Sequence, residues 1–518
     1  MTLARSTSDA ALQPQVTAGQ SSSPPRGSTR NRTALLLERI IFGCLALFAI
    51  ALPHSIKGAE RAWKLALVFW LAKLVVERVR PVKLPLTAPL LTFVILSAIS
   101  TMLSPDPYLS WDRMKFVCLV LAGIVVAQNI RRLAQVRWLV VLLVLSGFTA
   151  ALFTAWQYTH GIGVLVQDFP QTSRLARLGF EPNQIIVSVG GQRVHTPEQL
   201  IQTMRQLPPL ANVQVEYIPY QQSRPVLLSA APDDFHQAGL GTPAMRLARG
   251  KPYRAQGTLG HYVVFAEMLM QIGCLAWGLL LACQRGQGFQ KLVFAIAFAG
   301  ITAALFMTET RAAVAGLVIG CLFTVLLLEK GAQRWAAVAG MLLILAGATF
   351  WIQHHRGVHW VDRNDIGTHF RVLMWEDGIR LVRQHPWFGV GMETVRIHWA
   401  EWNIRGFIQY HVQSHFHSTY LQIAVERGIP ALLAWLWFCL AYIVLLFRLV
   451  VRMRTQSRLA CAIAAGILAS FVAFNFTSFF HYNLGEEPLA MLLFFYYGLA
   501  AALDRISLLP AGSNRPLA

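Results

Sequence analysis

The sequence predicts an all-α polytopic membrane protein that carries one small α+β insert. Of its 518 residues, 55% are hydrophobic and the mean hydropathy is +0.47, which is more apolar than a soluble protein. Many apolar runs reach the roughly 20 residues that a helix needs to cross a bilayer. One segment between these runs instead alternates apolar and polar residues in short stretches, which is typical of strands.

About twelve spans are expected from this length rule. They lie near residues 34–53, 62–79, 85–103, 114–129, 136–157, 258–283, 290–308, 311–328, 335–352, 429–448, 458–480 and 487–503. Residues 1–33 are polar and rich in Ser, Pro and Thr, so we expect a disordered tail rather than a cleavable signal peptide.

Loop charges predict the orientation. Alternate short loops are basic, and this places them and both termini in the cytoplasm: Arg78, Arg80, Lys83; Arg131, Arg132, Arg137; Arg285, Lys291; Lys330, Arg334; Arg448, Arg452, Arg454 and Arg458. Topology therefore accounts for much of the net charge of +20, and no nucleic-acid partner is expected. All seven cysteines fall in apolar runs, so no disulfide framework or cysteine metal cluster is indicated.

These signals divide the chain into seven segments. They are a cytoplasmic tail (1–33), spans one to five (34–157), an outward-facing insert (158–232), spans six to nine (233–352), an outward-facing loop with interfacial helices (353–428), spans ten to twelve (429–505) and a second cytoplasmic tail (506–518). In the long loop, Met374, Ile379, Leu381 and Trp387 have the spacing of helices that lie along the membrane interface.

The insert resembles a bacterial PDZ domain. The matching stretches are GIGV at 161–164, LGFEPNQIIVSVGGQRV at 178–194 and TPEQLIQTMRQLPP at 196–209. The resemblance implies that the backbone amides of Gly161, Ile162, Gly163 and Val164 receive a peptide C-terminus beside an open strand edge. The alternative is a module that only packs on the membrane domain.

A candidate general base begins the stretch QSHFHSTYLQIAVERG at 413–428. Ser418 is a plausible N-cap, and the apolar spacing after it predicts a helix whose first turn carries His417. An imidazole at the membrane surface suits a general base, although a histidine there also occurs without any chemistry. His415 is the second choice, and Tyr420 is a candidate substrate contact.

Arginines gather at the expected outer surface. Arg246, Arg249 and Arg254 precede the sixth span, and Arg311 sits in a turn too short to leave the membrane surface. An arginine there needs a polar cavity or a partner, or else snorkels to the interface. Glu267 is a further ionisable group inside the sixth span, with no assigned role.

The long loop is rich in histidine, so metal binding is an alternative for it. The runs HWVDRND from His359 and HVQSHFH from His411 could supply ligands. Neither run has the HExxH or Cys-paired spacing of known sites, and we expect no metal.

Four separated stretches together resemble the O-antigen ligase and polymerase superfamily of bacterial envelope enzymes. They are RAQGTLGH from Arg254, TETRAA with Arg311, the run from Phe370 that ends in Pro-x-x-Gly-x-Gly (386–391), and HSTYLQIAVERGIPALLAW from His417. Ser418 stands where the family more often has Asn. The resemblance covers most of the membrane region and leaves out the tail and the insert.

The resemblance implies a metal-free and nucleotide-free glycosyl transfer on the periplasmic side of the inner membrane. The donor would be a glycan on undecaprenyl diphosphate, and the acceptor lipid A-core or another glycan. Independently, arginine forks suit the leaving diphosphate, so Arg254 and Arg311 are assigned to it, with Arg371 as a further substrate contact. His417 would accept the acceptor's proton in a one-step inverting displacement, because no carboxylate is singled out as a nucleophile.

Three other functions stay open. A polymerase of the same pathway shares the fold and motifs, although the histidine just before the tenth span favours a ligase. A protein O-oligosaccharyltransferase would use the insert to present a polypeptide. A transporter is less favoured, because the polar residues concentrate in outward loops and the sequence has no internal repeat.

Overall fold

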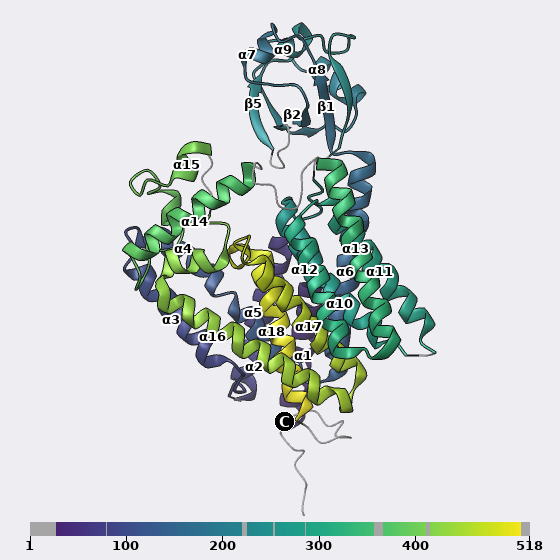
Figure 1. Cartoon of the computed structure of the whole chain (residues 1–518), viewed down its shortest axis with the longest axis vertical. Coiled ribbons are helices and arrows are strands. Elements are labelled where there is room, and N and C mark those ends of the chain that lie inside the picture. Colours follow the sequence, from purple (N-terminus) through teal and green to yellow (C-terminus); the bar gives the residue numbers. More distant parts are fainter. Residues whose placement is uncertain are drawn as a thin grey trace, which may run out of the picture.

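The structure is a computed structural model that describes residues 27–78, 80–219, 225–251, 254–284, 286–356, 366–410 and 415–508. Figure 1 shows a bundle of helices with a small sheet domain at one end. Residues 1–26 of the expected tail, the end of the chain from 509 and the HWVDRND run lie outside the described residues, as do the first four residues of HVQSHFH. The first helix begins at Gly27, so part of the segment expected to be a disordered tail is helical.

Within the described ranges, nine helices are long and apolar enough to cross a membrane. They are α1 (Gly27–Ala51), α6 (Leu133–His160), α10 (Tyr262–Ala282), α11 (Gly288–Met307), α12 (Arg311–Leu328), α13 (Gly331–Arg356), α16 (Thr419–Gln456), α17 (Arg458–Thr477) and α18 (Glu487–Ser507). The predicted polytopic helical fold is confirmed.

The remaining expected spans are present as helices of different form. They are α2 (Ile56–Glu77), α3 (Thr87–Met102), α4 (Pro107–Val117) and α5 (Val120–Asn129). Charged residues recur along α2, and α3 is only 16 residues long. The expected span at 114–129 is divided between α4 and α5, because the α-helical hydrogen bonding is interrupted at Cys118 and Leu119, where the bonds join residues three apart. These differences reduce the count from about twelve expected from the span-length rule.

The centre of the bundle is made of α10, α17 and α18, whose most apolar windows are 78–83% buried. Small residues let these helices approach closely. A Cβ added at Gly278 of α10 would lie 2.8 Å from the carbonyl oxygen of Ala462 on α17. Close contacts of this kind drive the association of helices inside lipid, because the lipid tails are as apolar as the side chains and no hydrophobic effect brings the helices together.

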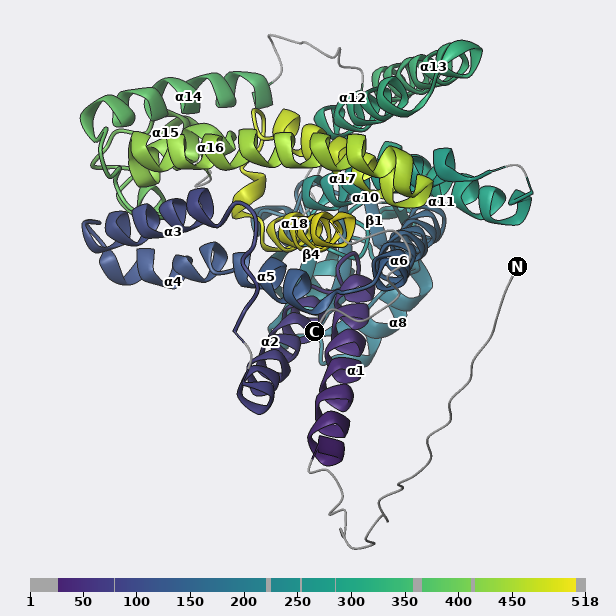
Figure 2. The same ribbon diagram turned by 90° about the horizontal axis from the view of Figure 1, so that it is seen from below.

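A second layer packs on the outer part of α16. It contains α14 (Ile366–Gln384), η1 (Thr394–Arg396) and α15 (Arg405–Tyr410), and Figure 2 shows α14 beside α16, on the same side of the bundle as α3 and α4. Met374 and Leu381 are buried in its core, whereas Ile379 and Trp387 are exposed. The predicted helix is present as α14, whereas Trp387 lies after its end, and a position along the membrane interface stays a prediction.

The insert is an antiparallel sheet with three short helices. Its order along the sheet is β5-β4-β2-β1-β6, with β3 paired to β2. The elements are β1 (Gly163–Asp168), α7 (Arg174–Arg177), β2 (Gln184–Val189), β3 (Gln192–Arg193), α8 (Pro197–Gln206), β4 (Val213–Ile218), β5 (Val226–Ala230), α9 (Pro232–Gln237) and β6 (Arg246–Gly250). Phe180 and Phe235 lie at the centre of a separate core, so the α+β insert was predicted correctly, and its sheet extends past residue 232.

The predicted peptide-binding loop is occupied by the chain itself. The N–H of Gly161 donates to Gln157, and that of Ile162 donates to the carbonyl of Gly250. Strand β1, which holds Gly163 and Val164, pairs with β2 on one side and β6 on the other. A peptide terminus would have to displace β6 to reach this loop, so peptide binding here stays a prediction.

Candidate active site

A cavity of about 1010 Å³ opens between the inner bundle and the α14 layer. It is at the upper end of the volumes found for small-molecule sites, and so accommodates a large ligand. Its walls come from α2, α4, α10, α12, α14 and the loops before α16 and α18. Elements far apart in the sequence therefore meet around one space.

The three residues predicted to carry the chemistry all line this cavity. Arg254 precedes α10, Arg311 begins α12, and His417 precedes α16. The guanidinium of Arg254 lies over the ring of Tyr262, 4.5 Å from its centroid, which holds the flat cation in place. Arg371, on α14, also lines the cavity, as predicted for a substrate contact.

The structure places three other predicted contacts away from the cavity. Arg246 and Arg249 lie in β6 and pair with β1 of the insert. Tyr420 donates its hydroxyl to Asn475 Oδ1 on α17 (2.9 Å). The arginines were expected at the membrane surface from their charge alone, but the strand pairing joins them to residues some 80 positions earlier in the chain.

His417 precedes its helix rather than belonging to the first turn. Its φ is +49°, in the left-handed region that costs a side chain energy. Ser418 is the N-cap, as predicted, and accepts from the N–H of Leu421 (3.4 Å). The ring of His417 meets Phe370 edge to face, with the centroids 5.4 Å apart. This conformation directs the chain back toward the cavity before the helix begins.

The imidazole of His417 is neutral at physiological pH. Burial lowers its pKa to about 3, and the positive charges of Arg371 and His481 contribute. Burial and the neighbouring imidazoles of His417 and His481 also hold the pKa of His415 well below its ordinary value. A neutral imidazole has a lone pair that can accept a proton, which is the form a general base needs.

His481 was not predicted from the sequence. It follows α17, and its Nδ1 lies 3.0 Å from Oε1 of Glu267 on α10. Burial opposes its charge, but the attraction and hydrogen bond of Glu267, with Glu486 adding to them, raise the pKa of His481. A titratable residue directly after a span was the only available signal, and it did not show which loop His481 would face.

His415, His481 and Glu486 form a group that could hold a metal ion. One ligand atom from each lies within 4.8 Å of the others. The carboxylate of Glu267 behind His481 is the kind of partner that orients a ligating imidazole. The same cavity wall includes Arg254, Arg311 and Arg371, whose charges oppose a cation.

The glycine-rich turn after α14 docks on a kink in α16. At Gly428 the helix has φ 84° and ψ 170°, so the carbonyls before it are released from the helical pattern. The N–H groups of Val390 and Gly391 donate to the carbonyls of Val425 and Glu426 (2.9 and 2.8 Å). The kink and the turn thus satisfy each other's backbone groups.

This docking leaves no space for a side chain at the glycines. A Cβ at Gly389 would lie under 3.0 Å from the backbone of Glu426, and one at Gly428 equally close to the backbone of Trp387. A Cβ at Gly391 would instead meet the side chain of Ser104. The Pro-x-x-Gly-x-Gly motif and the glycine after Glu-Arg are therefore two halves of one contact.

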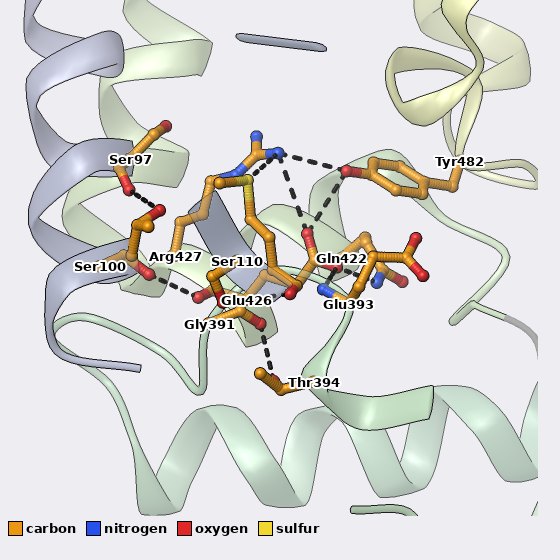
Figure 3. A network of polar contacts seen from close by, with 12 residues as sticks. Ser97, Ser100, Ser110, Gly391, Glu393, Thr394, Gln422, Glu426, Arg427 and Tyr482 are labelled. Carbon is orange, nitrogen blue, oxygen red and sulfur yellow. Dashed lines mark hydrogen bonds and ion pairs between the residues drawn. The ribbon is translucent and has the colours of Figure 1, made fainter. Parts of the chain in front are cut away.

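Figure 3 shows the polar network under this contact. The carboxylate of Glu426 accepts from the N–H of Glu393 (3.0 Å), from Gln422 Nε2 (2.8 Å) and from the hydroxyl of Tyr482 (3.4 Å). Gln422 Oε1 in turn accepts from the N–H of Phe416 (2.8 Å), directly before His417. The network therefore links the docked turn to the loop that carries the candidate base.

Comparison with known families gives a match over part of the chain. Residues 292–436 match the family described as O-Antigen ligase, a region from α11 into α16 that contains Arg311, Arg371 and His417. Arg254 and the insert lie outside the match, and no curated protein matches the chain. The match supports the O-antigen ligase superfamily for the domain at residues 292–436.

Proposed function

We propose that this protein transfers a glycan from undecaprenyl diphosphate to a sugar hydroxyl of lipid A-core, on the periplasmic face of the inner membrane. The family supports an enzyme of lipid-linked glycans. The observation that carries the finer proposal is the meeting of a neutral imidazole, His417, with Arg254, Arg311 and Arg371 in one cavity.

The arginines suit the leaving group. As the bond between the anomeric carbon and the diphosphate oxygen breaks, negative charge grows on the diphosphate. Guanidinium groups stay charged at all physiological pH values and bind phosphate oxygens through two parallel N–H groups. Arg254, Arg311 and Arg371 come from three separate elements, so they can surround a diphosphate rather than touch one side.

His417 suits the acceptor. The acceptor oxygen attacks the anomeric carbon while His417 takes its proton, and the diphosphate leaves from the opposite side with inversion. A positioned base of this kind contributes about 10²–10⁴-fold to a rate. Because the charge of Arg371 lowers the pKa of His417, a donor diphosphate bound to Arg371 raises that pKa and makes His417 a better base.

The test is a lipopolysaccharide gel from a strain that lacks the gene, together with extraction of carrier-linked glycans. The strain is complemented with wild type, His417→Ala or His398→Ala. His398 is a matched control, because it lies in the second layer around α14 and its Nδ1 is 3.0 Å from a carboxylate oxygen of Glu401. We expect His417→Ala to leave lipid A-core uncapped with long glycans on the carrier, and His398→Ala to restore capping.

Other outcomes separate the alternatives. Core capped by a single repeat unit would identify a polymerase. An unchanged gel with altered glycoproteins would identify a protein glycosyltransferase. Full capping by His417→Ala, radiolabelled sugar trapped on the protein, or a product that retains the donor's anomeric configuration would refute the mechanism.

A further inference from the structure

A buried carboxylate and a buried imidazole lie behind His415 in the cavity wall. Glu267 is 1% exposed and His481 is 6% exposed, and both line the cavity. An ionisable residue inside a membrane helix is costly, and such residues are kept where they serve a function. His481 is the partner that the sequence could not assign to Glu267, since its Nδ1 lies 3.0 Å from Oε1 of Glu267.

A continuous series of contacts joins this pair to the candidate base. The ring of His481 meets that of His415 edge to face at 5.4 Å, and the ring of His415 lies 4.5 Å from that of His417. Nδ1 of His415 also accepts the backbone N–H of His417 (3.1 Å). Since this N–H needs a lone pair on Nδ1, neutral His415 carries its proton on Nε2.

The turn that carries His481 is attached to the start of α16. The N–H of Thr419 donates to the carbonyl of Ser478 (2.8 Å), and its hydroxyl donates to the carbonyl of His481 (3.0 Å). The position of His481 relative to His417 is therefore set by backbone contacts, and a change of side chain at either residue leaves these contacts in place.

We propose that Glu267 and His481 are positioning residues for the transfer reaction, and that they act on His417 through the ring of His415. This inference rests on the proposed role of His417 as the base. Glu267 fixes the ring of His481, His481 fixes the ring of His415, and His415 holds the strained backbone of His417 by its N–H.

The charges give the same unit an electrostatic effect. Glu267 raises the pKa of His481, and the positive charge of a protonated His481 lowers the pKa of His417. Several further groups face this cluster and contribute to its field. They are His261 and Arg254 at the start of α10, Arg311 at the start of α12, Arg371 on α14, and Glu486 before α18.

Two variants test the unit, Glu267→Gln and His481→Gln. Glutamine at 267 removes the charge that raises the pKa of His481, and glutamine at 481 removes the imidazole. In both, His417 loses a neighbouring positive charge, so its pKa rises and the acid limb of kcat/KM moves to higher pH. We expect kcat to fall by about 10- to 100-fold, as found for residues that orient a reacting group, with the donor KM nearly unchanged.

The measurement is a rate profile that extends from below the pKa of His417, about 3, to about pH 9, with purified full-length protein, carrier-linked glycan and acceptor. Gln271→Leu is the matched control. Gln271 is buried on α10 one turn beyond Glu267, and its described contact is made by its backbone carbonyl. Size exclusion and thermal melting of each variant show whether it is folded, and the control is expected to keep the wild-type profile.

The outcomes distinguish this inference from the proposed function. If His417→Ala is inactive but Glu267→Gln and His481→Gln keep wild-type kcat and acid limb, the inference is wrong and the function stands. A lower kcat with an unmoved acid limb, or the same shift in Gln271→Leu, would mean a purely structural role and also overturn it. If His417→Ala is active, both fail.

Discussion

Replacing Gly428 with alanine tests the contact between the glycine turn and α16. Alanine at φ 84° and ψ 170° occupies a region that only glycine adopts freely, which costs about 1–3 kcal/mol. Its Cβ would also lie within 3.0 Å of the backbone of Trp387, and overpacking of this kind costs about 1–3 kcal/mol more. The atoms that this Cβ would meet belong to the backbone of Trp387 and Phe388, so no flexible side chain can move aside to relieve the strain.

The expected loss of about 2–6 kcal/mol is a large part of a typical folding free energy. For a chain of this size it lowers the melting temperature in detergent by roughly 2–6 °C. Gly340→Ala, on α13, is the matched control, because its added Cβ meets nothing within 4 Å. Alanine is favoured over glycine in a helix, so this control is expected to melt no lower than wild type. Equal melting of Gly428→Ala and wild type would refute the docking argument.

Three further predictions concern the cavity. Arg311→Lys keeps the charge but loses the planar fork, so we expect kcat to fall about 10- to 100-fold with purified substrates, and wild-type kcat would contradict the assignment. Arg371→Gln removes a charge that lowers the pKa of His417; since a base works above its pKa, the acid limb of kcat/KM should move to higher pH, and an unmoved limb would count against the contact. Treatment with a chelator should leave activity unchanged, whereas loss that Zn²⁺ restores would favour a metal at His415, His481 and Glu486.

The membrane fold could be predicted because its signals are local. Apolar length alone located most helices, and alternation located the insert. The division at Cys118 and Leu119 was not predictable, because the residues there are as apolar as those of an unbroken span. Strand β6 was missed for another reason. Its five residues, Arg246–Gly250, acquire their structure from pairing with β1, a partner that no local pattern reveals.

The site residues also divide into those with a local signal in the sequence and those that depend on a distant partner. Arg254, Arg311 and His417 were found because each is a charged or titratable group at the end of an apolar run, where the membrane surface must lie. Glu267 was noted but had no partner until α10 and the loop after α17 came together. His481 had no pattern of its own, since its role depends on which histidine the fold places beside it. Pairings of this kind are tertiary and lie beyond sequence periodicity.

The separate motifs make sense as parts of one contact. Docking of Gly389 and Gly391 on the kink at Gly428 places the N–H of Glu393 on the carboxylate of Glu426. Gln422 extends this network to Phe416, since its amide nitrogen donates to Glu426 and its amide oxygen accepts from the N–H of Phe416. Phe416 directly precedes His417, whose left-handed backbone has to be held by such neighbours. The glycines therefore act on the candidate base through packing and backbone geometry, and this explains why the turn and the histidine helix occur together in one domain.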